Sequence, residues 1–371
     1  MDSDIQVTQE NKEFRILTAI GMITVVLGHL NSNVLDVFGL FPYYSYHVFI
    51  FVFVAGYFYK PKVQENLLSY IGHKFLKLMV PYYIWNLLYG ILTMILHNVG
   101  FTIGYNLSFR TMFLDPFLGG HHFMYHFPSW FVPALFVIEV VNVLGRKVLS
   151  VFRLDKEWLI FCSCLFMGIM TVYLAIGGHV WGYYKDVGRI LFLMPGFQLG
   201  RIYKEKIEKY NHFNIYLYLF VIIMIQLIIR FTQGGLNFSA VWVTSFANGP
   251  LVPFLTVTTG IAFWIGISKI LNKIPYVNKL MVTIGRNSFR IMMHHMSMFL
   301  LLKTIFLGIK AWQFQRGIEI FKDFDMNEYL QNVSYVYLPD GKPLWIIPYI
   351  VIGIGVPVFM GEVMKRIYQR K

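Results

Sequence analysis

The first long apolar run of the chain lies between two ionisable residues, Arg15 and His29. Ionisable side chains are costly inside a membrane, so each one in or beside an apolar run is a candidate functional residue. An imidazole exchanges protons near neutral pH, which makes His29 a candidate general base. The neighbouring Gly28 permits close approach of a ligand or another backbone. The alternative is a hydrogen-bonded structural histidine near the membrane interface.

A second histidine, His47, opens the next apolar run after the sequence YYSY. Because consecutive membrane spans run antiparallel, we expect His47 and His29 at the same depth, where they can share a polar site. The alternative is an interfacial aromatic belt that contains an ordinary histidine.

Two lysines, Lys74 and Lys77, precede the third apolar run and share one face of a helix. If they face a cavity, they can bind phosphate, for which lysine is a common point-charge ligand. The alternative is a pair of basic anchors at the membrane edge. Arg15 is expected at the same edge, about 21 Å from His29 along a helix.

An acid, Glu139, lies inside the fourth apolar run and needs a partner there. In the ninth run Arg290 and His294 are four residues apart, so both are expected to face the interior of the bundle. An ion pair with Glu139 would explain Arg290 structurally.

A metal site is a weaker possibility. His121, His122 and His126 form an HHx3H cluster in a loop, but no cysteine and only one acid, Asp115, lie nearby. Zinc needs three or four well-placed ligands, so no metal site is predicted. Serine nucleophile elbows, phosphate-binding glycine loops and dinucleotide fingerprints are absent as well.

The composition of the chain indicates which kind of structural element must position these residues. Of 371 residues 57% are hydrophobic and 14% are charged, whereas soluble domains carry about 25% charged residues. An ordinary soluble enzyme, a disordered chain and a disulfide scaffold, given only two cysteines, are excluded. We predict an all-α integral membrane protein, a bundle of about ten transmembrane helices. The apolar runs are residues 16–31, 44–59, 75–97, 129–144, 158–178, 184–200, 213–230, 251–270, 288–308 and 345–363.

The net charge of +13 follows the membrane topology. Most lysines and arginines fall in the segments on one side, so the positive-inside rule predicts that both termini are cytoplasmic. No nucleic-acid partner is therefore needed to explain the charge. We predict one multi-pass domain over 1–371, with a cytoplasmic segment 1–15 and tail 364–371, in the plasma membrane of a bacterium. The long opposite loops, 98–128 and 309–344, can fold over an outward-facing cavity.

Five short motifs occur in an order and spacing that resembles the acyltransferase-3 family of integral-membrane acyltransferases. The chain looks most similar to the stand-alone, fucose 4-O-acetylase-like branch. The motifs here are GMITVVLGH ending at His29, YHVFIFVFVAGY over 46–57, KFLKLMVPY over 74–82, SWFVPALF over 129–136, and IGRNS over 284–288 with His295 downstream.

The resemblance implies transfer of an acyl group, here O-acetyl, from cytosolic acyl-CoA to a sugar hydroxyl of a surface polysaccharide or its lipid-linked precursor. It implies His29 as general base and Lys74 and Lys77 as ligands of the donor phosphates. Acyl-CoA is then a substrate, and no bound cofactor is expected. The partners are the glycan and the lipid bilayer. Further substrate-binding residues are expected among Arg15, His47, Trp130, Glu139, Arg286 and His295.

The chain departs from the family pattern at several positions. Thr18 stands where the family commonly has a basic residue, and lysines replace the arginine pair. Lysine keeps the charge but loses the bidentate geometry of arginine. Val48 and Ala55 replace a proline and a serine of the second motif. The alternative function is a polysaccharide exporter or flippase built on the same fold, and a purely structural membrane component is disfavoured by the clustered histidines and cations.

Overall fold

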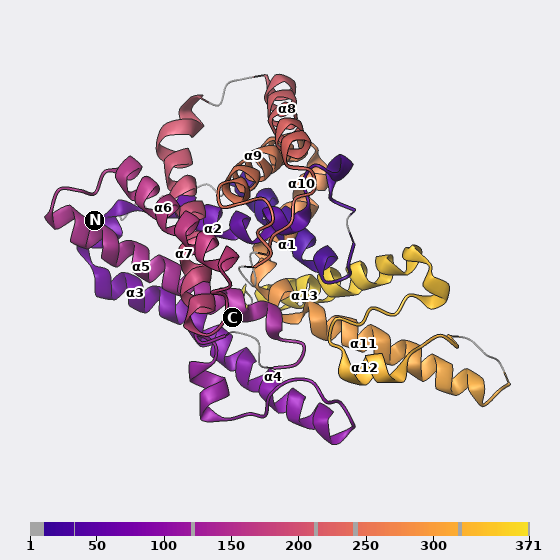
Figure 1. Cartoon of the computed structure of the whole chain (residues 1–371). Coiled ribbons are helices and arrows are strands. Elements are labelled where there is room, and N and C mark those ends of the chain that lie inside the picture. The colour runs from indigo at the N-terminus through magenta and orange to yellow at the C-terminus, as the bar shows by residue number, and fades with distance from the viewer. Residues whose placement is uncertain are drawn as a thin grey trace.

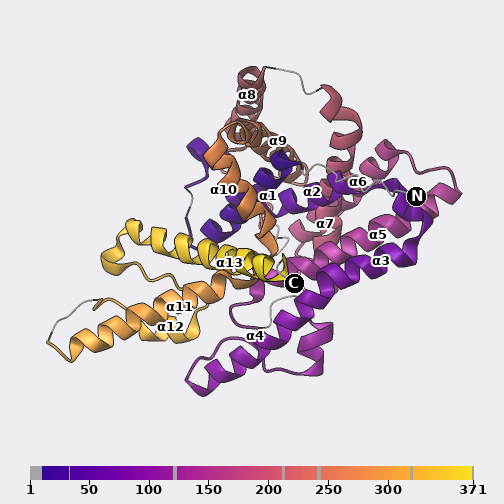
Figure 2. The same ribbon diagram turned by 180° about the vertical axis from the view of Figure 1, so that it is seen from behind.

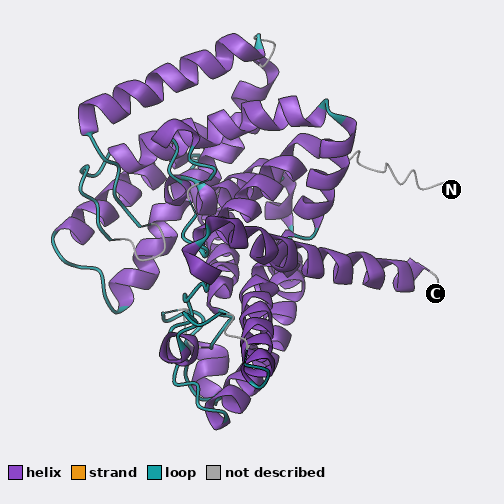
Figure 3. Ribbon diagram, turned by 90° about the vertical axis from the view of Figure 1, so that its right-hand side faces the viewer, coloured by secondary structure: helices purple, strands orange, loops and turns teal. Residues whose placement is uncertain are grey.

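The computed structural model describes residues 11–32, 34–119, 123–210, 214–239, 244–317 and 321–369. Over these residues the protein is a bundle of helices with no strand beyond an isolated bridge (Figure 1, Figure 3). The predicted all-α class is confirmed.

Every one of the ten apolar runs contains a helix. These helices are α1 (Lys12–Gly28), α2 (His47–Phe58), α4 (Val80–Asn98), α5 (Phe131–Val151), α6 (Glu157–Ile176), α7 (Tyr183–Ile202), α8 (Ile215–Gln233), α9 (Val252–Asn272), α11 (Ser288–Phe314) and α13 (Ile346–Gln369). The other α-helices of the described chain are shorter, and they are α3 (Leu67–Lys74), α10 (Pro275–Arg286) and α12 (Met326–Gln331).

Seven helical segments of the described chain are long and apolar enough to cross a membrane, and Tyr43–Phe58 is apolar but shorter. The protein is thus an integral membrane protein. The number of ten spans and the cytoplasmic termini stay predictions. The seven segments are Leu67–Asn98, Phe127–Val151, Glu157–Ile176, Ile215–Gln233, Val252–Asn272, Ser288–Phe314 and Pro343–Ile367.

Helix α1 forms the centre of the bundle and packs against α2, α9, α10 and α11. Figure 1 and Figure 2 show α1 and α2 in the middle, with α11, α12 and α13 together on one side. Most residues of α1 are buried, although the helix has only 17 residues. Both ends of this buried helix therefore lie where neighbouring helices can supply further site residues.

Small residues bring α2 and α7 into close backbone contact. A Cβ added at Gly56 would overlap the backbone oxygen of Phe197, and one at Gly200 would overlap that of Phe53. Interfaces between membrane helices commonly use such small residues, because they allow the backbones to approach. This contact fixes α2, and with it His47, relative to the rest of the bundle.

Candidate active site formed by two cavities at the ends of α1

Arg15 and His29, the two candidate residues of the first apolar run, lie at the two ends of α1. The side chain of Asn11 caps the helix by accepting a hydrogen bond from the backbone N–H of Phe14, and Arg15 lies in the first turn. At the other end Gly28 is the last helical residue and His29 is the cap. Each end opens into its own cavity.

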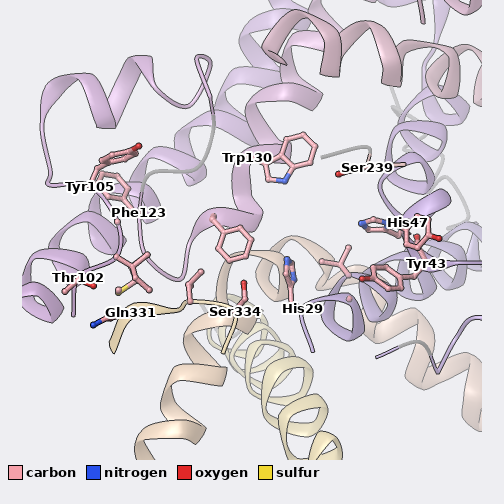
Figure 4. A pocket seen from close by; sticks show the side chains of 18 of the residues that line it. His29, Tyr43, His47, Thr102, Tyr105, Phe123, Trp130, Ser239, Gln331 and Ser334 are labelled. Carbon is pink, nitrogen blue, oxygen red and sulfur yellow. The ribbon is translucent and has the colours of Figure 1, made fainter. Parts of the chain in front are cut away.

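The cavity at the C-terminal end of α1, called the His29 cavity, has a volume of about 1030 Å³. His29 and His47 both line it, as their expected common depth predicts. Figure 4 shows His29 between Tyr43 and His47 on one side and loop residues on the other. Its walls are rich in aromatic side chains, which are Tyr43, Tyr44, Tyr105, Phe123, Phe127, Trp130 and Phe238.

Both long loops contribute to the His29 cavity. Residues 102–105 come from the first loop, and Gln331, Val333 and Ser334 come from the second. Both loops thus line one cavity, as their length allows, and its outward orientation stays a prediction. The individual residues were not predicted, because a loop has no periodicity that would show which side chains point inward.

His29 contacts a histidine of α11 directly. Its Nδ1 lies 2.9 Å from Nε2 of His295, and Nδ1 of His295 lies 2.8 Å from the backbone oxygen of Ile291. His295 is fully buried. The ring of Phe127 packs edge-on against His29. His295 therefore lies behind His29 rather than in the cavity wall, where it can set the position of the His29 ring.

Trp130 is held in the wall of the His29 cavity from behind. The guanidinium of Arg189 in α7 lies 4.5 Å from the centre of the Trp130 ring, within the range of a cation–π contact. Arg189 also donates a hydrogen bond to the backbone oxygen of Gly119. His47 is held by a different contact, in which its Nδ1 lies 2.7 Å from the backbone oxygen of Tyr43.

The cavity at the N-terminal end of α1, called the Arg15 cavity, has a volume of about 510 Å³. Four cationic residues line it, namely Arg15, Lys60, Lys74 and Lys77. Thr18 lines it too, but its hydroxyl donates to the backbone oxygen of Phe14. This concentration of cations suits an anionic ligand.

A turn of π-helix at Phe75–Met79 joins α3 to α4 and carries Lys77. Pro81 follows it, and proline has no N–H to donate to the carbonyl four residues earlier, which is that of Lys77. Such π-turns occur frequently at functional sites. Here Lys74 and Lys77, on either side of the change in helical pitch, both reach the same cavity.

The partner of Glu139 corrects an interpretation of the sequence. Nζ of Lys74 lies 2.7 Å from Oε1 of Glu139, which is buried. Arg290 instead donates to the side-chain oxygen of Asn287, so the ion pair between Glu139 and Arg290 is not formed. The reason is packing, since α3 lies against α5 and brings Lys74 to the acid.

Residues that are neighbours in the chain line different cavities. Met22 lines the Arg15 cavity, and Val25, three residues later, lines the His29 cavity. Phe131 and Trp130 are adjacent and line the Arg15 and His29 cavities respectively. Met292 lines the Arg15 cavity one turn before the buried histidine of α11. The two cavities therefore approach one another along α1, α5 and α11.

Two further candidates do not join either cavity. Arg286 is exposed at the C-terminal end of α10 and lines neither of them. His126 is buried and stacks on the ring of Tyr89. His121 and His122 lie outside the described residues. Within the described chain no three His, Cys, Asp or Glu residues are grouped as metal ligands would be.

A family model described as an acyltransferase domain (Acyl_transf_3) matches residues 11–361, which is nearly the whole chain. Comparisons with curated proteins and with solved structures gave no significant match. The match covers all the helices that form both cavities. The chain therefore belongs to the acyltransferase-3 family, and it is a membrane acyltransferase.

Proposed function

We propose that this protein transfers an acyl group, most simply acetyl, from cytosolic acyl-CoA to a hydroxyl of a cell-surface polysaccharide or its lipid-linked precursor, with His29 as general base. The observation that carries the proposal is the position of His29. It lines a large aromatic cavity at one end of α1, and a cationic cavity lies at the other end of the same helix.

The Arg15 cavity suits the donor. Coenzyme A carries several phosphates, and Arg15, Lys74 and Lys77 supply cations that can bind them. The pantetheine arm is long and thin, so it can extend from this cavity toward His29. The distance of about 21 Å along α1 defines the span that the arm must cover. Met22 and Met292, which line this cavity, have flexible side chains that can move aside.

The His29 cavity suits a carbohydrate acceptor. Its volume of about 1030 Å³ lies at the upper end of the range for small-molecule sites. Tyrosine and tryptophan present an apolar ring and a polar group together, which matches the alternating apolar faces and hydroxyl edges of a sugar. His47, Trp130 and Tyr105 are the residues that we propose to orient the acceptor.

The proposed reaction is a direct acyl transfer. His29 accepts the proton of the acceptor hydroxyl as the hydroxyl oxygen attacks the thioester carbonyl carbon. The new C–O bond forms and the C–S bond breaks. The coenzyme A thiolate leaves and takes the proton from His29, so that an ester and free coenzyme A are the products. General base catalysis of this kind contributes about 10²–10⁴-fold in rate.

We propose that the Arg15 cavity faces the cytoplasm and the His29 cavity faces outward across the plasma membrane of a bacterial cell. The basic segments at the Arg15 end support this orientation through the positive-inside rule. Soluble acyl-CoA then reaches its site from inside, and the glycan reaches its site at or beyond the outer surface. Neither cavity requires a nucleic acid or a bound cofactor.

The test is His29→Ala, expressed in cells that lack the wild-type gene. We expect the alkali-labile acyl esters of the surface glycan to disappear, while protein level and glycan export stay normal. His179→Ala is the matched control, because His179 is exposed and lines neither cavity. Unchanged acyl content in His29→Ala would contradict the proposal.

The alternative is a polysaccharide exporter or flippase. One observation favours it, which is that Lys74 already has a partner in Glu139 and so contributes less charge to donor binding. Export predicts that deletion of the gene traps glycan inside the cell, and that any glycan still exported carries a normal acyl content. The acyltransferase predicts normal export of glycan without the ester.

A further inference from the structure

We infer that His295 is a positioning residue, which fixes the tautomer of His29 so that its Nε2 carries the lone pair needed to accept a proton. This inference rests on the proposed role of His29 as general base. The hydrogen-bond chain from Ile291 through His295 to His29 carries it.

The first step concerns the proton on His295. Its Nδ1 lies 2.8 Å from the backbone oxygen of Ile291. A carbonyl oxygen only accepts hydrogen bonds, so Nδ1 of His295 must carry the proton and donate it. A neutral imidazole has one N–H, and therefore Nε2 of His295 is an acceptor.

His295 is neutral for a physical reason. Its ring is fully buried beside Phe299, and a buried charge is costly without an ionic partner. No carboxylate of the described residues pairs with it, since its hydrogen bonds go to Ile291 and His29. The second nitrogen of His295 is thus an acceptor and not a second donor.

The second step concerns His29. Its Nδ1 lies 2.9 Å from Nε2 of His295, and because that nitrogen accepts, Nδ1 of His29 must donate. The proton of neutral His29 then resides on Nδ1, and its lone pair resides on Nε2. Catalytic histidines are commonly oriented in this way by an acceptor behind the ring. In this chain the acceptor is another histidine, which takes its own orientation from a helix carbonyl.

The neighbouring histidine provides a contrast within the same helix turn. Nδ1 of His294 lies 2.9 Å from the hydroxyl of Tyr89, and its ring packs against Trp85. His294 thus faces α4 and makes no hydrogen bond to His29. A change at His294 disturbs a buried histidine of α11 without touching the proposed tautomer, so it serves as a matched control.

The first experiment compares substitutions at His295 in membrane vesicles, with acetyl-CoA as donor. We expect His295→Phe to lower kcat by about 100-fold or more, since loss of the orienting acceptor in a catalytic triad costs up to about 10⁴-fold. The KM for acetyl-CoA should stay unchanged, because His295 does not line the Arg15 cavity. His295→Gln, which keeps an acceptor, should recover at least about one tenth of the activity, and His294→Phe should keep most of it.

The second experiment reads the tautomer directly. In ¹⁵N NMR of the purified, histidine-labelled protein, His29→Ala identifies the His29 signals. We expect Nδ1 of His29 to be protonated and Nε2 unprotonated in the wild-type protein, and a mixture of tautomers in His295→Phe. Because the wild-type spectrum alone gives the tautomer, the test holds even if His295→Phe fails to fold.

The outcomes separate this inference from the proposed function. An active His29→Ala variant would overturn both. An inactive His29→Ala variant together with a fully active His295→Phe variant, or a wild-type His29 protonated on Nε2, would overturn only the positioning role of His295.

Discussion

At the scale of single residues, the charge inside the Arg15 cavity is already partly compensated. Lys74 is paired with Glu139, and Arg15, Lys60 and Lys77 line the same cavity. The Glu139 side chain is buried and that of Lys74 is partly exposed. Glu139 therefore holds the Lys74 ammonium at one place in the cavity, while it also weakens the attraction of Lys74 for a phosphate.

Two lysine variants separate donor binding from stability. Lys77→Ala should raise the KM for acetyl-CoA by about tenfold or more with little change in kcat, since a hydrogen bond to a charged group contributes about 1.5–3 kcal/mol. Lys74→Ala should also lower the protein level, because it leaves the buried Glu139 without a partner. Kinetics in vesicles and quantitative immunoblots measure the two effects.

The double variant Lys74→Ala/Glu139→Gln is the control for that separation. It removes the buried charge together with its partner, so the protein level should recover while the KM stays high. A normal KM in the double variant would show that Lys74 does not bind the donor.

The common depth of His29 and His47 and the shared helix face of Lys74 and Lys77 could be predicted from the sequence, because they depend only on local geometry. A helix has a fixed rise and antiparallel spans share a depth. The partner of Glu139 depends instead on how α3 packs against α5, and nothing in the spacing of the residues encodes that contact. The same limit applies to the contact between His29 and His295, which are far apart in the sequence.

At the scale of elements, one buried lysine connects α11 to both loops of the His29 cavity. Nζ of Lys303 donates to the backbone oxygen of Tyr335 at 3.0 Å and lies 5.4 Å from the ring centre of Tyr125. Tyr125 and Tyr335 directly follow Met124 and Ser334, which line the cavity. Lys303 thus holds two loops that form one wall.

Lys303→Met should loosen that wall. We expect faster protease cleavage of the 309–344 loop in intact cells and reduced acylation of the glycan, with the KM for acetyl-CoA unchanged. Lys342→Met is the control, because Lys342 is an exposed residue of the same loop that pairs with the exposed Asp340. Equal cleavage rates in the two variants would contradict the clamping role of Lys303.

The contact between α1 and α10 depends on a glycine of the IGRNS motif. A Cβ added at Gly285 would overlap the backbone oxygen of Arg15. Gly285→Ala should therefore push α10 away from α1 and destabilise the protein by about 1–3 kcal/mol, the usual cost of overpacking. The melting temperature in detergent measures this effect. Gly308→Ala, where a Cβ meets no atom within 4 Å, should not lower it, and equal melting temperatures would refute the close contact.

At the scale of the whole molecule, the two cavities open from opposite ends of one buried helix. The ten apolar runs and the helical class could be predicted from the sequence, because a membrane span has a characteristic length and is mostly apolar. The cavities themselves could not be predicted, since each combines residues from helices and loops far apart in the sequence. Seven of the helical segments meet the criteria of a membrane span by length and apolarity, and α1 is not among them.

The orientation in the membrane is testable with single cysteines on a background lacking Cys162 and Cys164. Lys342→Cys, in the loop after α11, should react with an impermeant maleimide in intact cells. Lys209→Cys, between α7 and α8, should react only after lysis. Labelling of Lys209→Cys in intact cells would reverse the orientation and place the Arg15 cavity outside, away from cytosolic acyl-CoA.

The most direct test of the central claim is transfer of radiolabelled acetyl from acetyl-CoA, supplied to inside-out vesicles that contain the glycan acceptor. Wild-type vesicles should place the label in alkali-labile esters of the glycan, and His29→Ala vesicles should not, although their protein level is normal. Label transfer by His29→Ala at the wild-type rate would contradict the account.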